Sequence, residues 1–281
     1  MNRLRTVVFI DGRNFKKNLQ EYTFNTGSGD KDYRLDEKHF DWQSFFQGVL
    51  DKFTKSTGTI HRIIRVYWYN AESISPYKDN NRLITDIYNK YKTKFKSLTE
   101  KNIHNLTLEW WKKERDNFNR AKDDVYESIQ KQTDFLEFKY VGYYIVKPYT
   151  VYRFEQNQNG SFFYEGTRQG EKGVDIGIAI DMIAKMNFYD VAILVSGDAD
   201  FQPVVRYLKD HLKQVYQFSI ATGVPPQINY LSAYLKSMVD VFQHFDEEEL
   251  LGKYLKRNTI PSSILPVIDQ RIENLRKQKN P

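Results

Sequence analysis

Short apolar runs that alternate with amphipathic segments are the feature that most constrains the fold of this chain. Residues 7–10, 60–69, 191–195 and 215–220 are rich in β-branched and aromatic side chains, as expected of buried strands. Residues 40–53 instead repeat apolar side chains at four-residue spacing, which is typical of a helix. Strands that alternate with helices predict an α/β fold with a mostly parallel sheet.

Four further helices are expected from apolar side chains at helical spacing. They cover residues 14–22, 174–186, 202–212 and 231–245. Each of the first three stands next to a predicted strand, so each supports the same alternating pattern. The fourth is the last amphipathic helix of the predicted core.

The middle of the chain interrupts this pattern with an insertion from residue 72 to about residue 165, which is polar as far as about residue 131. Apolar positions at helical spacing predict a pair of helices in the polar part, and a turn at residues 156–160 predicts a hairpin between residues 135–154 and 161–164. Residues 77–131 hold 13 Lys or Arg against 9 Asp or Glu. We therefore expect one domain over residues 1–245, interrupted by a basic insertion, and a basic extension over residues 246–281.

Composition excludes several classes of protein. The 281 residues include no cysteine, so the chain has no disulfide, thiolate zinc site or cysteine nucleophile. The longest apolar runs are too short to span a bilayer, and residues 7–10 are too short for the core of a signal peptide. We therefore expect a cytoplasmic protein without a membrane partner. The net charge of +6 allows a polyanion as partner.

Acidic side chains follow two of the predicted strands, at the point where each strand ends. Asp11 comes directly after the first strand, and Asp198 and Asp200 follow residues 191–195 after a short link. Because parallel strands end at the same edge of a sheet, these acids are expected to converge on one crevice. Asp175 begins a predicted helix and is expected to face that crevice as a fourth acid.

Converging carboxylates repel one another, and a hard divalent cation such as Mg²⁺ or Mn²⁺ relieves that repulsion. A nuclease uses such a cation to orient a phosphate and to help ionise water. The alternative is capping, because Asp11, Asp175 and Asp200 each precede a predicted helix. Asp181 lies about 120° around the helix from Asp175, so it is expected to be structural or supporting.

Other catalytic motifs are missing from the sequence. Residues 166–172 have Glu171 where a P-loop needs its second glycine, and the five histidines lack the spacing of a zinc protease. Ser196 lacks the flanking glycines of a nucleophile elbow. A phosphatase of the haloacid dehalogenase type is disfavoured, because Gln202 stands where that motif needs Thr or Val.

Three segments together resemble a known family. Residues 8–14 read Val-Phe-Ile-Asp-Gly-Arg-Asn, residues 172–175 read Lys-Gly-Val-Asp, and residues 196–201 read Ser-Gly-Asp-Ala-Asp-Phe. In this combination the chain resembles the NYN (LabA-like) family of PIN-like nucleases. The resemblance covers residues 1–70 and 166–245 and leaves the insertion unexplained.

The resemblance implies a Rossmann-like, PIN-like α/β core with an acidic, metal-binding nuclease site that usually acts on RNA. It assigns acidic and metal-binding roles to Asp11, Asp175, Asp198 and Asp200, with Asn14 and Ser196 supporting. The prediction is a metal-dependent endoribonuclease that uses Mg²⁺ or Mn²⁺. The alternative is a catalytically silent RNA-binding or regulatory protein with the same domain.

Single-stranded RNA is the expected partner, and self-association stays open. Basic and aromatic side chains of the insertion are expected to grip the RNA, although tryptophan and tyrosine in paired helices more often serve the core. The aromatic candidates are Trp110, Trp111, Tyr143, Tyr144 and Tyr152. The basic candidates are Arg13, Lys172, Lys112, Lys113 and Arg115.

Overall fold

A computed structural model describes residues 3–25 and 32–279 and divides the chain into two compact units. The core unit comprises residues 1–70, 125–139 and 175–281, and the insertion unit comprises residues 71–124 and 140–174. The sequence predicts the insertion at about residues 72–165. In the structure the segment 125–139 returns to the core unit between the two parts of the insertion unit.

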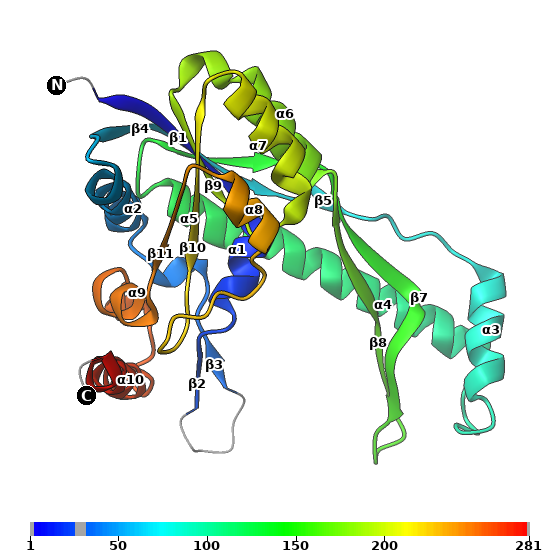
Figure 1. The fold of residues 1–281 in the computed structure, drawn as a ribbon. Coiled ribbons are helices and arrows are strands. Elements are labelled where there is room, and N and C mark those ends of the chain that lie inside the picture. Colours follow the sequence, from blue (N-terminus) through cyan, green and yellow to red (C-terminus); the bar gives the residue numbers. More distant parts are fainter. Residues whose placement is uncertain (1–2, 26–31, 280–281) are drawn as a thin grey trace. The chain divides into compact units, whose positions relative to one another are not determined.

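The core unit is built on a six-stranded sheet in the order β11-β10-β9-β1-β4-β6 (Figure 1). The parallel pairs are β11 with β10, β10 with β9, β9 with β1 and β1 with β4. This is the α/β fold with a mostly parallel sheet that the apolar runs predict. The strands are β1 (Leu4–Asp11), β4 (His61–Asn70), β6 (Leu136–Tyr140), β9 (Val191–Val195), β10 (Gln214–Ile220) and β11 (Val241–Phe245).

Large aromatic side chains cover one face of this sheet. Trp68 of β4 packs against Trp42 of α2 (Trp42–Thr57), and Phe45 of α2 meets Phe218 and Phe245 from β10 and β11. Because side chains alternate along a strand, Tyr69 points to the other face, where its hydroxyl donates to Asp181 of α6 (Val174–Ala184). Helices on both faces explain why β9 is apolar at every position.

The remaining helices of the core unit connect and flank these strands. They are α1 (Gly12–Leu19), α5 (Glu127–Gln130), α7 (Gln202–Asp210), α8 (Ala233–Met238), α9 (Glu247–Lys253) and α10 (Leu265–Lys279), with 3₁₀ turns η1 (Glu37–His39), η3 (Met186–Phe188), η4 (Ala199–Phe201) and η5 (Arg257–Thr259). A two-stranded ribbon joins β2 (Thr23–Phe24) to β3 (Tyr33–Arg34).

The single helix expected over residues 231–245 is wrong. The segment instead forms the short helix α8 and the sheet strand β11, which pairs with β10. Residues 241–245 pair with β10 as an edge strand of the parallel sheet, and this pairing overrides the helical spacing of the apolar side chains.

The basic C-terminal segment packs on the core unit through α10. Ile268, Ile272 and Leu275 of this helix are buried. Arg271 forms an ion pair with the buried Glu247, and Arg276 and Lys279 pair with acids of the turn before α9 and of α9 itself. Much of the charge surplus of this segment is therefore used within the core unit.

The insertion unit contains the two expected helices and a long hairpin. Its helices are α3 (Asn81–Tyr91) and α4 (Glu100–Arg120), and α4 continues into a π-helical segment, η2 (Ala121–Tyr126). The hairpin pairs β7 (Tyr143–Gln156) with β8 (Phe162–Lys172), and β5 (Ser73–Ile74) adds a short parallel strand. The predicted hairpin is therefore confirmed from residue 143 onwards, but its predicted first strand at residues 135–154 is wrong at its start, because residues 136–140 form β6 of the core sheet.

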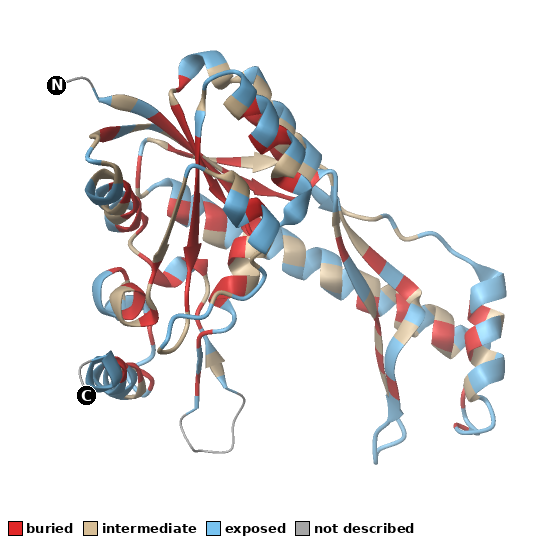
Figure 2. Cartoon of the chain, viewed as in Figure 1, coloured by how far each residue is buried: buried red, intermediate tan, exposed pale blue. Residues whose placement is uncertain are grey.

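The insertion unit has an apolar core of its own, formed between its helices and its hairpin (Figure 2). Trp110 of α4 is 5% exposed, and its ring lies so close to Gly166 of β8 that a Cβ there would meet it at 2.6 Å. Phe95 and Phe154 pack edge to face in the same core. This packing explains why the unit is compact although its surface is polar.

Across the described residues, no helix combines the length and the apolar character that crossing a bilayer requires.

Candidate active site

Asp11 ends β1 and is the most buried of the four predicted acids, with 5% of its surface exposed. Its carboxylate accepts a hydrogen bond from the backbone amide of Asn14 at 3.0 Å, so Asp11 caps α1. It also accepts a hydrogen bond from the Ser196 hydroxyl at 2.9 Å. Burial raises the pKa of Asp11, and these two hydrogen bonds oppose the rise.

Ser196 joins Asp11 to the second acidic segment. It follows β9, which is the direct neighbour of β1 in the sheet, and its hydroxyl also accepts a hydrogen bond from the Asp198 amide at 3.2 Å. Asp198 in turn caps η4 by accepting from the Asp200 amide at 3.0 Å. The parallel pairing therefore brings the segment after β1 and the segment after β9 into one hydrogen-bonded cluster.

Capping explains only part of this cluster. Asp11 and Asp198 cap α1 and η4, whereas Asp175 lies in the first turn of α6 and Asp200 lies within η4. The capping alternative for Asp200 is wrong, because the predicted helix after it is α7, whose N-cap residue is Phe201. The sequence does not predict a cap at Asp198, because it shows no helix start directly after this residue.

Asn14 and Gly197 fix the loop that carries these acids. The side-chain oxygen of Asn14 accepts a hydrogen bond from the Gly197 amide at 3.1 Å. Gly197 lies so close to the chain at Tyr230 that a Cβ would sit 1.7 Å from the Tyr230 carbonyl oxygen. Only glycine fits there, which is a physical reason for the Ser-Gly-Asp sequence of this loop.

The pKa of Asp175 shows that the four acids influence one another. Burial is the main cause that raises this pKa to about 6, and the negative charges of Asp11, Asp198 and Asp200 raise it further. Arg13 is close enough to lower it in part. Asp11, Asp198 and Asp200 therefore lie near enough to Asp175 for their charges to affect its pKa.

The four carboxylates do not form a tight cage. Among residues 3–25 and 32–279, no three acidic or histidine side chains are close enough together to hold one metal ion. Their donor chemistry nevertheless fits Mg²⁺, because that ion binds oxygen and usually keeps several waters, with one or two carboxylates and a substrate phosphate as its other ligands. An open group of carboxylates leaves room for these waters and for a phosphate.

Asp181 has a structural environment. Its carboxylate accepts a hydrogen bond from the Tyr69 hydroxyl at 2.7 Å and forms an ion pair with Lys185. Although burial alone would raise the pKa of Asp181, these two partners hold it below its ordinary value. The side chain thus fastens α6 to β4.

The basic side chains of the insertion that the sequence predicts to bind RNA differ in their environments. Lys112 and Lys113 are exposed on α4, and Lys172 is exposed at the end of β8. Arg115 forms an ion pair with Asp116 and lies over the ring of Trp111. These side chains belong to the insertion unit, whereas all four predicted acids belong to the core unit.

Most of the predicted aromatic platforms are used for packing. Trp110 is buried in the core of the insertion unit, and the Trp111 indole donates to the Ser75 carbonyl at 2.9 Å. Tyr144 packs against the same core. Tyr143 and Tyr152 are the exposed members, at 43% and 74%.

Gln217 is a residue of the site that the sequence analysis missed. It is fully buried in β10, and its side-chain amide donates to the Ser196 carbonyl at 2.8 Å. Its other side-chain atom, Oε1, has no hydrogen-bond partner. The sequence signal that could have revealed it is a large polar side chain in the middle of the predicted buried strand 215–220.

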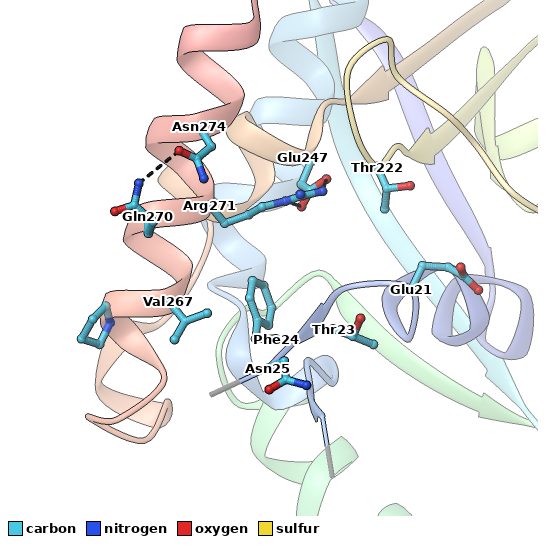
Figure 3. A pocket seen from close by; sticks show the side chains of 11 residues that line it. Glu21, Thr23, Phe24, Asn25, Thr222, Glu247, Val267, Gln270, Arg271 and Asn274 are labelled. Carbon is cyan, nitrogen blue, oxygen red and sulfur yellow. Dashed lines mark hydrogen bonds and ion pairs between the residues drawn. The ribbon is translucent and has the colours of Figure 1, made fainter. Parts of the chain in front are cut away.

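Figure 3 shows a hollow of the core unit with a volume of about 610 Å³, lined in part by residues of α10. Glu247 and Arg271 in its lining form an ion pair, and Glu247 also accepts from the Gly223 amide at 2.6 Å. These charges satisfy each other and hold α10 in place. None of the four predicted acids lines this hollow.

Comparison with known proteins identifies one family. The family model of the NYN domain matches residues 119–243, and no curated protein matches the chain. A protein of unknown function from Vibrio parahaemolyticus is similar at 16% sequence identity and a TM-score of 0.40, over 90% of this chain and 96% of that chain. The family match contains Asp175, Asp198 and Asp200 but not Asp11. Over residues 119–243 the chain is therefore similar to the NYN domain family.

Proposed function

We propose that this protein is a metal-dependent endoribonuclease that hydrolyses phosphodiester bonds of single-stranded RNA. The observation that carries this proposal is that the Ser196 hydroxyl donates to Asp11 and accepts from the Asp198 backbone amide, which holds two of the acids at one edge of the sheet. The charges of Asp11, Asp198 and Asp200 also add to the effect of burial in raising the pKa of Asp175. Those carboxylates come from three separate parts of the sequence and repel one another in one place. The NYN domain match supports a PIN-like nuclease fold. The finer likeness to LabA-like members and a cytoplasmic location belong to the same proposal.

In this proposal one or two of the acids Asp11, Asp175, Asp198 and Asp200 would bind Mg²⁺ or Mn²⁺ directly, and the others would contact it through water. The bound cation supplies charge neutralisation and helps ionise a water molecule for attack on the phosphorus. The chain contributes oxygen ligands whose mutual repulsion favours a cation between them. The sequence has no cysteine and therefore offers no thiolate ligand, which favours hard cations over zinc.

The supporting residues orient the ligands. Ser196 donates to one oxygen of Asp11, and Asn14 holds the Gly197 amide, so the loop before Asp198 cannot move away from β1. Gln217 holds the Ser196 carbonyl from the neighbouring strand. Such support keeps a reactive arrangement fixed before substrate arrives.

A catalytically silent RNA-binding protein is the second candidate, and one observation favours it. Asp11 and Asp198 both act as helix caps, and a cap stabilises the fold without any catalytic role. In that case the acids would persist for stability alone, and basic side chains would bind RNA.

The test is cleavage of a labelled single-stranded RNA with Mn²⁺, with Mg²⁺ and with EDTA. The parent chain is compared with Asp198→Asn and with Asp181→Asn. Asp181 is the matched control, because it lies on α6 with Asp175 but is bound to Tyr69 and Lys185. We expect metal-dependent cleavage by the parent and by Asp181→Asn, and none by Asp198→Asn.

Calorimetric titration of Mn²⁺ into the RNA-free protein separates the two candidates further. The proposal requires saturable binding that weakens in Asp198→Asn and survives in Asp181→Asn. RNA binding without cleavage and without Mn²⁺ binding would favour the silent protein, and cleavage that persists in EDTA would remove the metal from the reaction.

A further inference from the structure

A second hollow of the core unit, of about 350 Å³, lies between α1 and the β2–β3 ribbon. It is separate from the acids but shares a helix with the residues that support them. Its lining is mostly polar: Lys17, Gln20, Glu21, Thr23, Arg34 and Tyr230.

Two cations of this hollow lack an acidic partner within the described part of the chain. Neither Lys17 nor Arg34 forms an ion pair with an acid among residues 3–25 and 32–279. Lys17 is near enough to Asp11 for its charge to lower the pKa of that acid. Two basic side chains without an acidic partner attract anions. Because they lie beside the acidic cluster, they are suited to an extended anion that contacts both.

Tyr230 gives the hollow an aromatic wall. Its side chain is 51% exposed, and the Lys17 ammonium lies 5.4 Å from its ring centre. The backbone of Tyr230 lies against Gly197, directly before Asp198. The segment that carries the ring thus packs against the loop that carries two of the four acids.

Helix α1 also connects the hollow to the acidic cluster. Asn14 holds Gly197 at the acids, and Lys17 lies three residues further along the same helix. Positions three apart share a helix face and are separated by almost one turn, about 5 Å along the axis. The hollow therefore begins one helical turn beyond the acidic cluster.

From this juxtaposition we infer that the hollow binds the next nucleotide of a single-stranded RNA whose scissile phosphate lies at the acids. Lys17 and Arg34 contact its phosphate, and Tyr230 stacks on its base. This inference rests on the proposed ribonuclease function and adds a substrate-binding site to it. Basic side chains beside an aromatic ring are the combination by which proteins bind single strands without reading their sequence.

Glu21 is the one acid of the hollow, and it has a defined role there. Its carboxylate accepts a hydrogen bond from Asn229 at 3.1 Å and one from the Tyr230 hydroxyl at 3.4 Å. It therefore helps to hold the aromatic wall, while its charge opposes a phosphate. Two cations against one acid leave the lining with a positive balance.

The experiment measures binding of a fluorescein-labelled oligouridylate to the full chain by anisotropy, with EDTA present so that the strand is not cut. Lys17→Gln and Arg34→Gln are expected to weaken binding and to flatten its salt dependence, by about 0.7 in log–log slope for each phosphate that the variant no longer neutralises. Tyr230→Leu is expected to weaken binding roughly tenfold, whereas Tyr230→Phe retains the ring and the affinity.

Two variants make the test selective. Lys55→Gln is the matched control, because Lys55 is exposed in the last turn of α2, which leads into the opposite end of β4. Glu21→Gln should strengthen binding, since it removes the opposing charge and keeps an acceptor for Tyr230. Thermal melts show that each variant is folded.

The outcomes separate this inference from the proposed function. If Lys17→Gln and Arg34→Gln bind like the parent, or weaken binding no more than Lys55→Gln, the inference is overturned even when the parent cleaves RNA. If these variants bind the oligouridylate more weakly and with a flatter salt dependence while the parent never cleaves RNA, the hollow is an RNA-binding site and the ribonuclease proposal fails. A parent that does not bind the oligouridylate overturns the inference.

Discussion

The Ser196 hydroxyl donates a hydrogen bond of 2.9 Å to the Asp11 carboxylate, across 185 positions of sequence. The bond exists because β1 and β9 are neighbours in the sheet and both end at the same edge. One side chain comes directly from each strand end. The acidic site is therefore assembled only when the central pair of strands has formed.

Ser196→Ala is expected to destabilise the fold by about 1 to 3 kcal/mol, because it leaves a buried carboxylate with one hydrogen bond fewer. The pKa of Asp11 should rise further, since the Ser196 hydrogen bond opposes the effect of burial. Urea unfolding at neutral pH measures the first effect. Ser237→Ala is the control, because that exposed hydroxyl bonds only a nearby backbone carbonyl, and equal losses in the two variants would contradict the prediction.

Asp11→Asn is expected to abolish cleavage and to leave the protein at least as stable as the parent. The asparagine oxygen can still cap α1, and the variant no longer buries a charge. Asp11→Ala removes the cap as well and should cost about 1 kcal/mol relative to Asp11→Asn. Thermal melts compare the two, and a clear loss of stability in Asp11→Asn would show that the carboxylate charge itself supports the fold.

The sequence predicted this part of the site well, for a physical reason. Strands with apolar side chains at every position are buried on both faces, and in parallel sheets such strands end together. Asp11 and Asp198 could therefore be placed at one edge without knowledge of the loops between. Asp175 required a further assumption about the start of α6, and its raised pKa supports that placement.

The pH dependence of folding stability should reveal the raised pKa of Asp175. Its folded-state pKa of about 6 lies above the ordinary value of 3.8, so the folded protein binds the proton more tightly than the unfolded chain does. The contribution of this group is thus favourable at low pH and is lost as the pH rises from about 4 to 6. Asp175→Asn cannot titrate and should gain stability relative to the parent at pH 7 but not below pH 4.

The size of that difference should be of order 1 to 2 kcal/mol once solvent screening of this partly exposed group is allowed for. Urea unfolding of both proteins across this pH range, without divalent cations, provides the measurement. An offset between variant and parent that stays constant with pH would show that Asp175 titrates normally.

Gly197→Ala should disrupt the loop that carries Asp198. The added Cβ would sit 1.7 Å from the Tyr230 carbonyl oxygen, a clash that only a backbone shift can relieve. Overpacking of this kind typically costs about 1 to 3 kcal/mol. Gly252→Ala is the control: its Cβ has room, and alanine in α9 should be neutral or stabilising. Calorimetric melts compare them, and similar melting temperatures would mean that the loop adjusts freely.

Sequence patterns failed where pairing between distant segments decides the structure. Residues 136–140 and 241–245 became sheet strands because each reaches an edge of the core sheet, and no local pattern shows which edge is available. The prediction that aromatic residues of the insertion stack on RNA bases met a related difficulty. Trp110 and Trp111 stand next to basic residues in sequence, but the helix turns Trp110 into the apolar core and Trp111 towards Ser75.

Lys112 and Lys113 remain exposed beside those tryptophans and test whether the insertion grips RNA. If it does, replacing both with Gln should weaken oligouridylate binding and flatten its salt slope by about 0.7 for each phosphate that is no longer neutralised. Replacing Arg115 should add less, because Asp116 already neutralises it. Anisotropy titrations at several salt concentrations give both quantities. Unchanged affinity and slope in the folded double variant would show that this face of α4 is only solvated.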